Sequence, residues 1–223
     1  MPDNLDFLVD ARSYTVKGNE TAAYDHILYF RDRKQTEWSA HPLGFFVCKR
    51  VINDQLTVRM HVWPSDWSIP EDQVNADTHD HVFDLHSLVV LGTIYNEIFD
   101  IKVDALGNYL QYKISYKANS SGVDSNGNPT PVRMIRTGRS IYSTGQIYHL
   151  EKGNVHRGGL VQGPAVTLVA AVQKFAGGSP RIIVQGPGGV PPSFERRPPS
   201  ADEWTQIQRV VGQALLTYSS PPT

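Results

Sequence analysis

The sequence predicts an all-β protein, an antiparallel barrel or sandwich with one helix near each end of the chain. Apolar and polar residues alternate strictly over residues 56–63, which indicates a strand with one buried face. Further short segments of this kind are separated by turn residues, and 18 glycines and 15 prolines suit such a turn-rich fold. Helical spacing of apolar residues occurs only near the two ends.

The N-terminal part of the chain is expected to begin with a helix over residues 19–35. Apolar residues recur there at near-helical spacing; they are Ala22, Ala23, Ile27, Leu28 and Phe30. Residues 41–48 are apolar and expected to be extended. In the strand 56–63, one face carries Leu56, Val58, Met60 and Val62, and the other carries Thr57, Arg59, His61 and Trp63.

The middle of the chain is expected to contain the remaining strands. One strand covers 79–91, ends at Gly92 and is followed by another over 93–103. Residues 109–116 alternate again, and the polar segment 118–131 is expected to be an exposed loop. Later strands are expected near residues 132–136, 140–150, 155–161, 165–174 and 180–184.

The C-terminal part predicts a helix over residues 201–217. Ser200 and Glu203 form a capping-box pattern at its start. Its apolar residues fall on one face; they are Trp204, Ile207, Val210, Val211 and Leu215. The whole chain, 1–223, is therefore expected to be one domain, with a barrel core over about 54–185 and an N-terminal helix and extension over 1–53.

Composition excludes several classes of function. The 21 basic and 22 acidic residues balance, which argues against nucleic acid and anionic membrane surfaces as partners. No apolar run is long enough for a membrane helix, and no signal peptide is visible at the start. The single cysteine, Cys48, lies in an apolar run and predicts a buried thiol rather than a disulfide or nucleophile. A cytoplasmic location is expected.

Three histidines in two distant segments predict a metal site. Residues 79–86 read His-Asp-His-Val-Phe-Asp-Leu-His, and side chains two apart on an extended strand point the same way. His79 and His81 can therefore bind one ion, because neutral imidazole is the commonest protein metal ligand. His156 follows a glycine turn at Gly153, and a barrel would bring it to the same place.

This pair of segments resembles the two motifs of the cupin superfamily, over residues 54–185. The matching residues are His79, His81, Gly92, Gly145, Gly153 and His156. Three positions depart from the usual pattern: His86 replaces an acidic residue, Glu151 a proline and Leu160 an asparagine. The resemblance implies a cupin-type barrel or jelly roll that can pair into a homodimer.

The resemblance also implies a function. His79, His81 and His156 are expected to be metal ligands, with His86 either a fourth ligand or a neighbouring group that acts on the substrate. An all-histidine site points first to a non-haem Fe(II) dioxygenase, although Zn, Ni, Mn and Co also suit imidazole. Neutral ligands leave the ion's charge uncompensated, which favours an anionic small-molecule substrate. Candidate pocket residues are rich in aromatic rings, which favours a partly apolar one; they are Trp63, Phe83, Tyr95, Tyr142 and Tyr148. Arg59 is expected to bind a substrate carboxylate, and Tyr148 to line the pocket.

Two alternatives remain open. A cupin isomerase, cyclase or lyase would use the metal as a Lewis acid and consume no O₂, with His86, His149 or Glu97 moving a proton. A non-catalytic cupin would bind a small molecule without turnover. Oxygen uptake distinguishes the Fe(II) dioxygenase from both alternatives.

Overall fold

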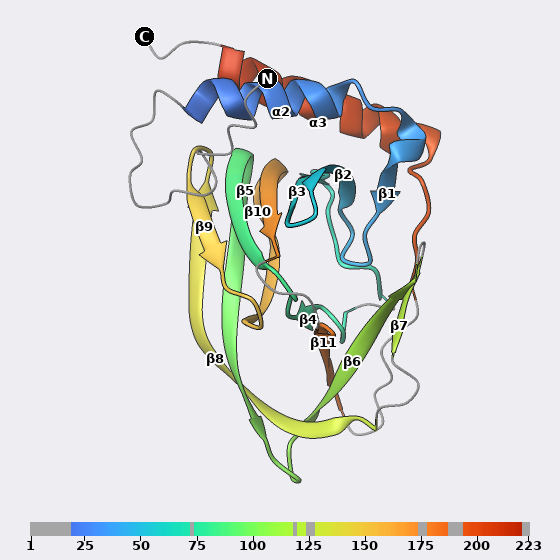
Figure 1. Ribbon diagram of the computed structural model, residues 1–223, viewed down its shortest axis with the longest axis vertical. Coiled ribbons are helices and arrows are strands. Elements are labelled where there is room, and N and C mark those ends of the chain that lie inside the picture. The colour runs from blue at the N-terminus through green and yellow to red at the C-terminus, as the bar shows by residue number, and fades with distance from the viewer. Residues whose placement is uncertain are drawn as a thin grey trace.

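The computed structural model describes residues 19–71, 74–117, 120–123, 128–173, 178–186 and 194–219, and it confirms the predicted all-β fold with flanking helices (Figure 1). The helical elements are α2 (Asn19–Arg31), the 3₁₀ turn η2 (Gln35–Glu37) and α3 (Ala201–Ser219). The strands are β1 (Trp38–Ala40), β2 (Phe46–Asn53), β3 (Leu56–Trp63), β4 (Thr78–His79), β5 (Asp84–Val103), β6 (Tyr109–Lys117), β7 (Ser120–Val123), β8 (Thr130–Ser143), β9 (Ile147–Leu150), β10 (Val155–Val172), β11 (Arg181–Gln185) and β12 (Phe194–Glu195).

Strand β10 connects the parts of the sheet. It pairs antiparallel with β3, with the short β4 and with the long β5. From β4 the described sheet continues through β11, β6 and β8 back to β5, so the strands wrap around a common interior (Figure 1). Strands β2 and β1 extend the sheet beyond β3, so it begins at Trp38, before the expected start of the barrel core.

Helices α2 and α3 lie side by side across one end of the molecule, and their apolar residues cover one face of the sheet (Figure 1). Ile27 of α2 and Ile207 of α3 are buried against Met60 of β3 in a single core cluster. We call the covered face of β2, β3, β10 and residues 84–91 the outer face. The opposite face, with Val47, Trp63, Val89 and Ala165 in a separate cluster, is the inner face.

The two helices end and begin for local reasons. At the start of α3, the backbone of Glu203 donates to Ser200 Oγ (3.3 Å) and the backbone of Ser200 donates to Glu203 Oε2 (2.7 Å), which is the predicted capping box. Helix α2 ends at Arg31, four residues before the expected position. The Arg33 amide bonds to the Phe30 carbonyl three residues back, a tightening common in a last helical turn.

A bulge at Gly92 changes which residues of β5 face inward. The strand runs through Gly92 instead of stopping there, but Gly92 has φ +79° and pairing with β10 shifts register nearby. Before the bulge Leu85, Ser87 and Val89 face inward; after it Ile94, Asn96 and Ile98 do. A side chain at Gly92 would overlap the Pro164 carbonyl oxygen, so only glycine fits this turn.

The segment expected to be a polar loop contains a short strand. Strand β7 pairs with the edge of β6 and with β12 near the end of the chain. Backbone hydrogen bonds hold it there, and these bonds need no apolar side chains. Residues 118–119 and 124–127 of this segment lie outside the described residues.

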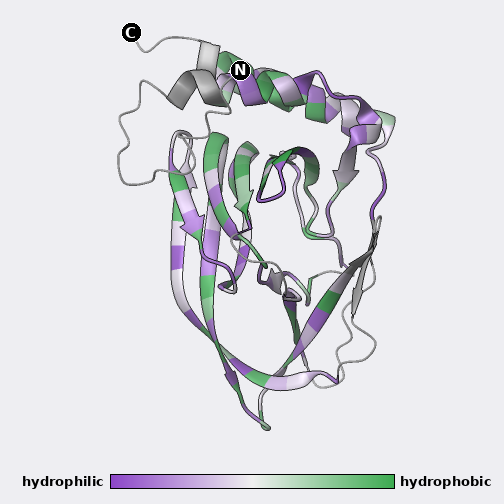
Figure 2. Ribbon diagram, in the orientation of Figure 1, coloured by the Kyte–Doolittle hydropathy of each residue, from purple (hydrophilic) through white to green (hydrophobic). Residues whose placement is uncertain are grey.

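Polar and apolar residues interleave along the helices and the long strands (Figure 2). Among the described residues, no helix is both long and apolar enough to cross a bilayer.

Candidate metal centre

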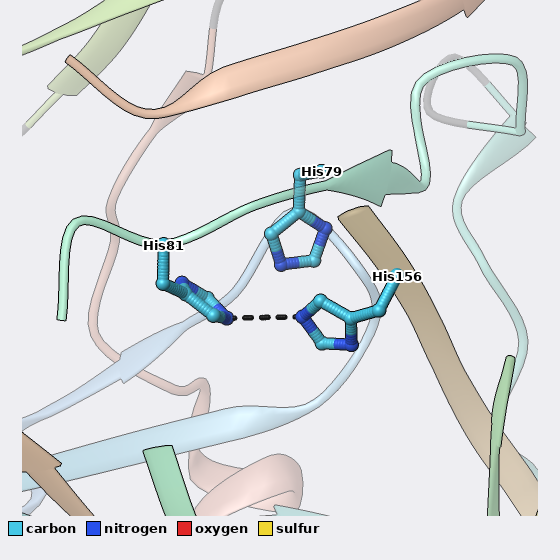
Figure 3. A group of neighbouring side chains, drawn as sticks. All are labelled: His79, His81 and His156. Atoms are coloured by element: carbon cyan, nitrogen blue, oxygen red, sulfur yellow. Dashed lines mark hydrogen bonds between the residues drawn. The ribbon is translucent and has the colours of Figure 1, made fainter. Parts of the chain in front are cut away.

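The structure brings together the three histidines of the two motifs. His79 lies on β4 and His156 on β10, where the two residues are direct cross-strand partners, and His81 follows β4 by two residues. One ligand atom from each histidine lies within 4.8 Å of the other two. Figure 3 shows the three rings converging on one point. The predicted ligand trio therefore forms a compact group with the composition of a metal site.

An ion-pair framework holds the two motifs in place. Arg181 on β11 donates from its backbone amide (2.6 Å) and from Nε (2.5 Å) to Asp80, the residue between His79 and His81. Arg181 Nη2 also donates to the Gly153 carbonyl (2.8 Å), and the Gly153 amide donates to the His81 carbonyl (3.0 Å). Asp80 is buried. Sequence reasoning missed both Arg181 and Asp80.

Hydrogen bonds at Nδ1 orient two of the rings. His79 Nδ1 lies 3.1 Å from the Asp77 carbonyl oxygen, and His156 Nδ1 lies 2.9 Å from Asn96 Oδ1. Both oxygens accept, so each Nδ1 carries the hydrogen and each Nε2 keeps its lone pair for a metal. Asn96 is buried in the middle of β5, and the bulge at Gly92 places it on the inner face.

The spacing of the ligand atoms fits a bound ion. The Nε2 atoms of His81 and His156 are 3.1 Å apart (Figure 3). Two metal–nitrogen bonds of about 2.1 Å at a right angle would separate their nitrogens by about 3.0 Å. The donor set therefore matches adjacent ligands on one ion.

Burial keeps the three imidazoles neutral. Desolvation lowers the pKa of His79, even though the carbonyl and carboxylate of Asp77 and the carboxylate of Asp80 oppose the shift. Desolvation, followed by repulsion from neighbouring histidines, holds the pKa of His81 and of His156 well below the usual value. A neutral ring is the form that binds a metal, so no proton has to leave at neutral pH.

His86, expected as a fourth ligand or as a catalytic group, lies elsewhere. It follows regular strand alternation onto the outer face of β5, and its ring stacks on His149 at 4.3 Å between centroids. The strand expected over residues 79–91 is interrupted between His79 and Asp84, and β5 alternates regularly from Asp84 past His86, with its bulge at Gly92 coming later. The inward positions beside it belong to Leu85 and Ser87, so the group at the centre has three histidines and not four.

Arg59 and Tyr148 lie in one row across the inner face. Arg59 pairs with Val169, Val169 with Ser87, and Ser87 with Tyr148. The Arg59 guanidinium carbon is 4.5 Å from the centre of the Phe83 ring, and Phe83 stacks on His81 at 4.9 Å. One phenyl ring thus connects Arg59 to the histidine group.

Tyr148 is partly buried and protonated. Burial raises the pKa of Tyr148 to about 12, against a hydrogen bond with Ser87. The ring also stacks on Tyr142 at 4.7 Å. Its hydroxyl can donate a hydrogen bond but does not serve as a base at neutral pH.

Glu97, considered as a proton-transfer group, lies on the face of β5 opposite Asn96 and Ile98. It forms ion pairs with Arg157 (2.5 Å), Arg136 (2.7 Å) and Arg139 (3.6 Å). Burial opposes ionisation, but these arginines outweigh it and lower the pKa of Glu97. The carboxylate therefore holds strands together rather than serving the histidine group.

No protein-family model matches the chain, and no curated protein shows significant similarity to it. Several solved structures are similar in fold. An RmlC-like cupin with a double-stranded β-helix fold from Methanocaldococcus jannaschii matches at 10% identity over 58% of this chain and 80% of its own, with a TM-score of 0.32.

Two metal-bound structures are also similar. FeII HppE in complex with substrate matches at 14% identity over 58% of this chain and 50% of its own (TM-score 0.33). Hydroquinone 1,2-dioxygenase PnpCD, bound to Cd²⁺ and 4-hydroxybenzonitrile, matches at 15% identity over 72% of this chain and 79% of its own (TM-score 0.36). At these identities and TM-scores the similarities assign neither a family nor an activity to this chain.

Proposed function

We propose that this protein is a metal-dependent enzyme acting on a small organic molecule, and that it is a non-haem Fe(II) oxygenase with His79, His81 and His156 as ligands. The convergence of three neutral imidazoles, two of them partly buried and one buried, carries this proposal. Iron bound there would supply open coordination positions and electrons for reaction with O₂, whereas Zn, Ni, Mn or Co would supply Lewis acidity.

The protein's own residues would orient the ligands and exclude water. Asn96 and the Asp77 carbonyl fix two of the rings through Nδ1. Leu85 and Val169 are buried in an apolar cluster on the inner face, with Phe83 packed against it. Tyr148 would donate a hydrogen bond to the substrate, and Arg59 would position an anionic group.

Oxygen uptake by the iron-reconstituted protein tests this function. With a panel of small aromatic and carboxylic compounds, we expect substrate-dependent O₂ consumption that His156→Ala abolishes. His149→Ala serves as the matched control, because His149 is exposed and outside the group, and it should retain activity. His86→Ala should keep its metal. Metal-dependent turnover without O₂ uptake would instead establish the isomerase or lyase alternative.

One observation favours that alternative. Leu85 and Ser87 occupy the inward positions of β5 near the histidines, so no carboxylate from this strand reduces the ion's charge. An ion held by three neutral ligands keeps strong Lewis acidity, which suits carbonyl polarisation. Metal binding without any turnover would identify a binding module.

Location and assembly stay predictions. We propose a cytoplasmic homodimer, which cell fractionation and light scattering of the purified protein can test.

A further inference from the structure

The inner face carries two like charges directly opposite each other. Lys49 on β2 and Arg59 on β3 are cross-strand partners, and alternation directs both inward, as it does Val47 and Trp63. Like charges in this position destabilise a sheet. Among the described residues, no acidic side chain forms an ion pair with Lys49. An unfavourable pairing of this kind is expected where the charges serve a ligand.

The positive charge extends beyond this pair. Partial burial, followed by repulsion from the positive charges of Arg59 and Arg196, lowers the pKa of Lys49 to about 8. The Lys49 side chain is nevertheless accessible to solvent. Burial, then Arg59, Lys49 and Arg196, lowers the pKa of His61 to about 3. These shifts indicate that Arg59 and Arg196 lie close enough to Lys49 and His61 to interact with them electrostatically.

Two buried hydrogen-bond donors share the same inner face. Thr167 Oγ1 and Trp63 Nε1 have no partner in the described structure, and their residues are 1% and 6% exposed. Thr167 is the cross-strand partner of His61, and Trp63 lies two residues further along β3. Buried donors in proteins nearly always have a partner, so unpaired ones on a single wall suggest a ligand that supplies acceptors.

Aromatic rings complete this wall. Phe45 packs 4.4 Å from Trp63 and 4.8 Å from His61, measured between ring centroids. Phe83 lies between Arg59 and His81, in contact with both. A ligand there would meet cations at one end, the Phe83 ring along its body and the histidine group at the other end.

We propose that the inner wall of β2, β3 and β10 is a carboxylate-binding subsite for an aromatic carboxylic acid substrate. Lys49 and Arg59 pair with the carboxylate, Thr167 and Trp63 donate to its polar atoms, and the ring extends along Phe83 toward the histidines. The planar guanidinium fork of Arg59 suits a carboxylate. This proposal rests on the proposed function, since it names the substrate class of the same site.

Calorimetric titration with benzoate and its neutral analogue benzamide tests the subsite, on the full chain both zinc-loaded and metal-free. We expect benzamide to bind at least about tenfold more weakly than benzoate. Lys49→Gln and Arg59→Gln should each weaken benzoate binding by about tenfold or more and leave benzamide unchanged. Lys102→Gln, which removes an exposed cation from β5, should have no effect.

Three results would overturn the subsite: equal binding of both probes, unchanged benzoate binding in Lys49→Gln, or benzoate binding that disappears when metal is removed. Lys49 is accessible, so its variant should fold even if Arg59→Gln does not. If the protein binds no metal but benzoate binding still depends on Lys49, the subsite stands and the metalloenzyme function fails. If the protein binds metal but binds benzoate and benzamide equally well, the carboxylate subsite fails and the metalloenzyme function stands.

Discussion

Replacing Asn96 by leucine should weaken metal binding without touching a ligand. Asn96 Oδ1 accepts the His156 Nδ1 hydrogen at 2.9 Å, and both residues are buried, with exposures of 5% and 7%. Leucine has a similar volume but no acceptor, so the Nδ1 hydrogen would stay buried and unpaired. That costs about 1–3 kcal/mol, which corresponds to a loss of about 5- to 150-fold in metal affinity. Removing a residue that hydrogen-bonds to a metal ligand typically lowers metal affinity by about 10- to 100-fold.

Competition with a chromophoric chelator measures this effect for Zn²⁺ or Co²⁺. Asn96→Asp is the matched control, since its carboxylate also accepts the Nδ1 hydrogen, and it should bind metal at least as tightly as the original protein. The reasoning is refuted if Asn96→Leu folds and binds metal with unchanged affinity, or if both variants lose affinity equally.

Three further outcomes follow from the framework and the buried histidines. Arg181→Gln would leave the Asp80 carboxylate buried without its cation. Because Arg181 is about a third exposed, the free energy of unfolding measured in urea titrations should fall by about 2 kcal/mol. An unchanged urea midpoint would contradict the ion-pair framework. Gly92→Ala should destabilise by about 2 kcal/mol or more, because alanine would overlap the Pro164 carbonyl at φ +79°; a thermal midpoint equal to the original would show that the bulge tolerates a side chain. Burial, and to a lesser extent the positive charge of Arg50, lowers the pKa of His26 to about 4. The unfolded state therefore takes up the proton at a higher pH than the folded state, so stability should fall as pH drops from about 6.5 toward 4. Urea titrations at several pH values should show a smaller pH dependence for His26→Gln.

The strongest local patterns predicted their elements well. Strict alternation over Leu56–Trp63 matches β3 at both ends, because an amphipathic strand has to place every second side chain in a core. The Ser200 and Glu203 pair marked the start of α3 for a similarly local reason. The two-residue spacing of His79 and His81 predicted that their rings lie close together, and the second motif predicted that His156 joins them; the three rings do lie together.

Features that depend on distant contacts were not predictable from these patterns. The resemblance implied that His86 turns inward, whereas its side chain follows the regular alternation of β5, and the bulge at Gly92 comes only further along the strand. Arg181 and Asp80 lie far apart in the chain, and a single ion pair leaves no periodic signal. Asn96 stands beside Glu97 and near Asp100 and Lys102 in the same strand, so its polarity alone did not single it out.

The most direct test of the metal centre is elemental analysis of the tag-free protein, before and after reconstitution with iron, beside its His81→Ala and His149→Ala variants. The structure predicts about one divalent ion per chain, as expected for a single group of three ligands, lost in His81→Ala and retained in His149→Ala. If the reconstituted protein holds no metal, or if His81→Ala retains as much as the original, then His79, His81 and His156 do not form a metal centre.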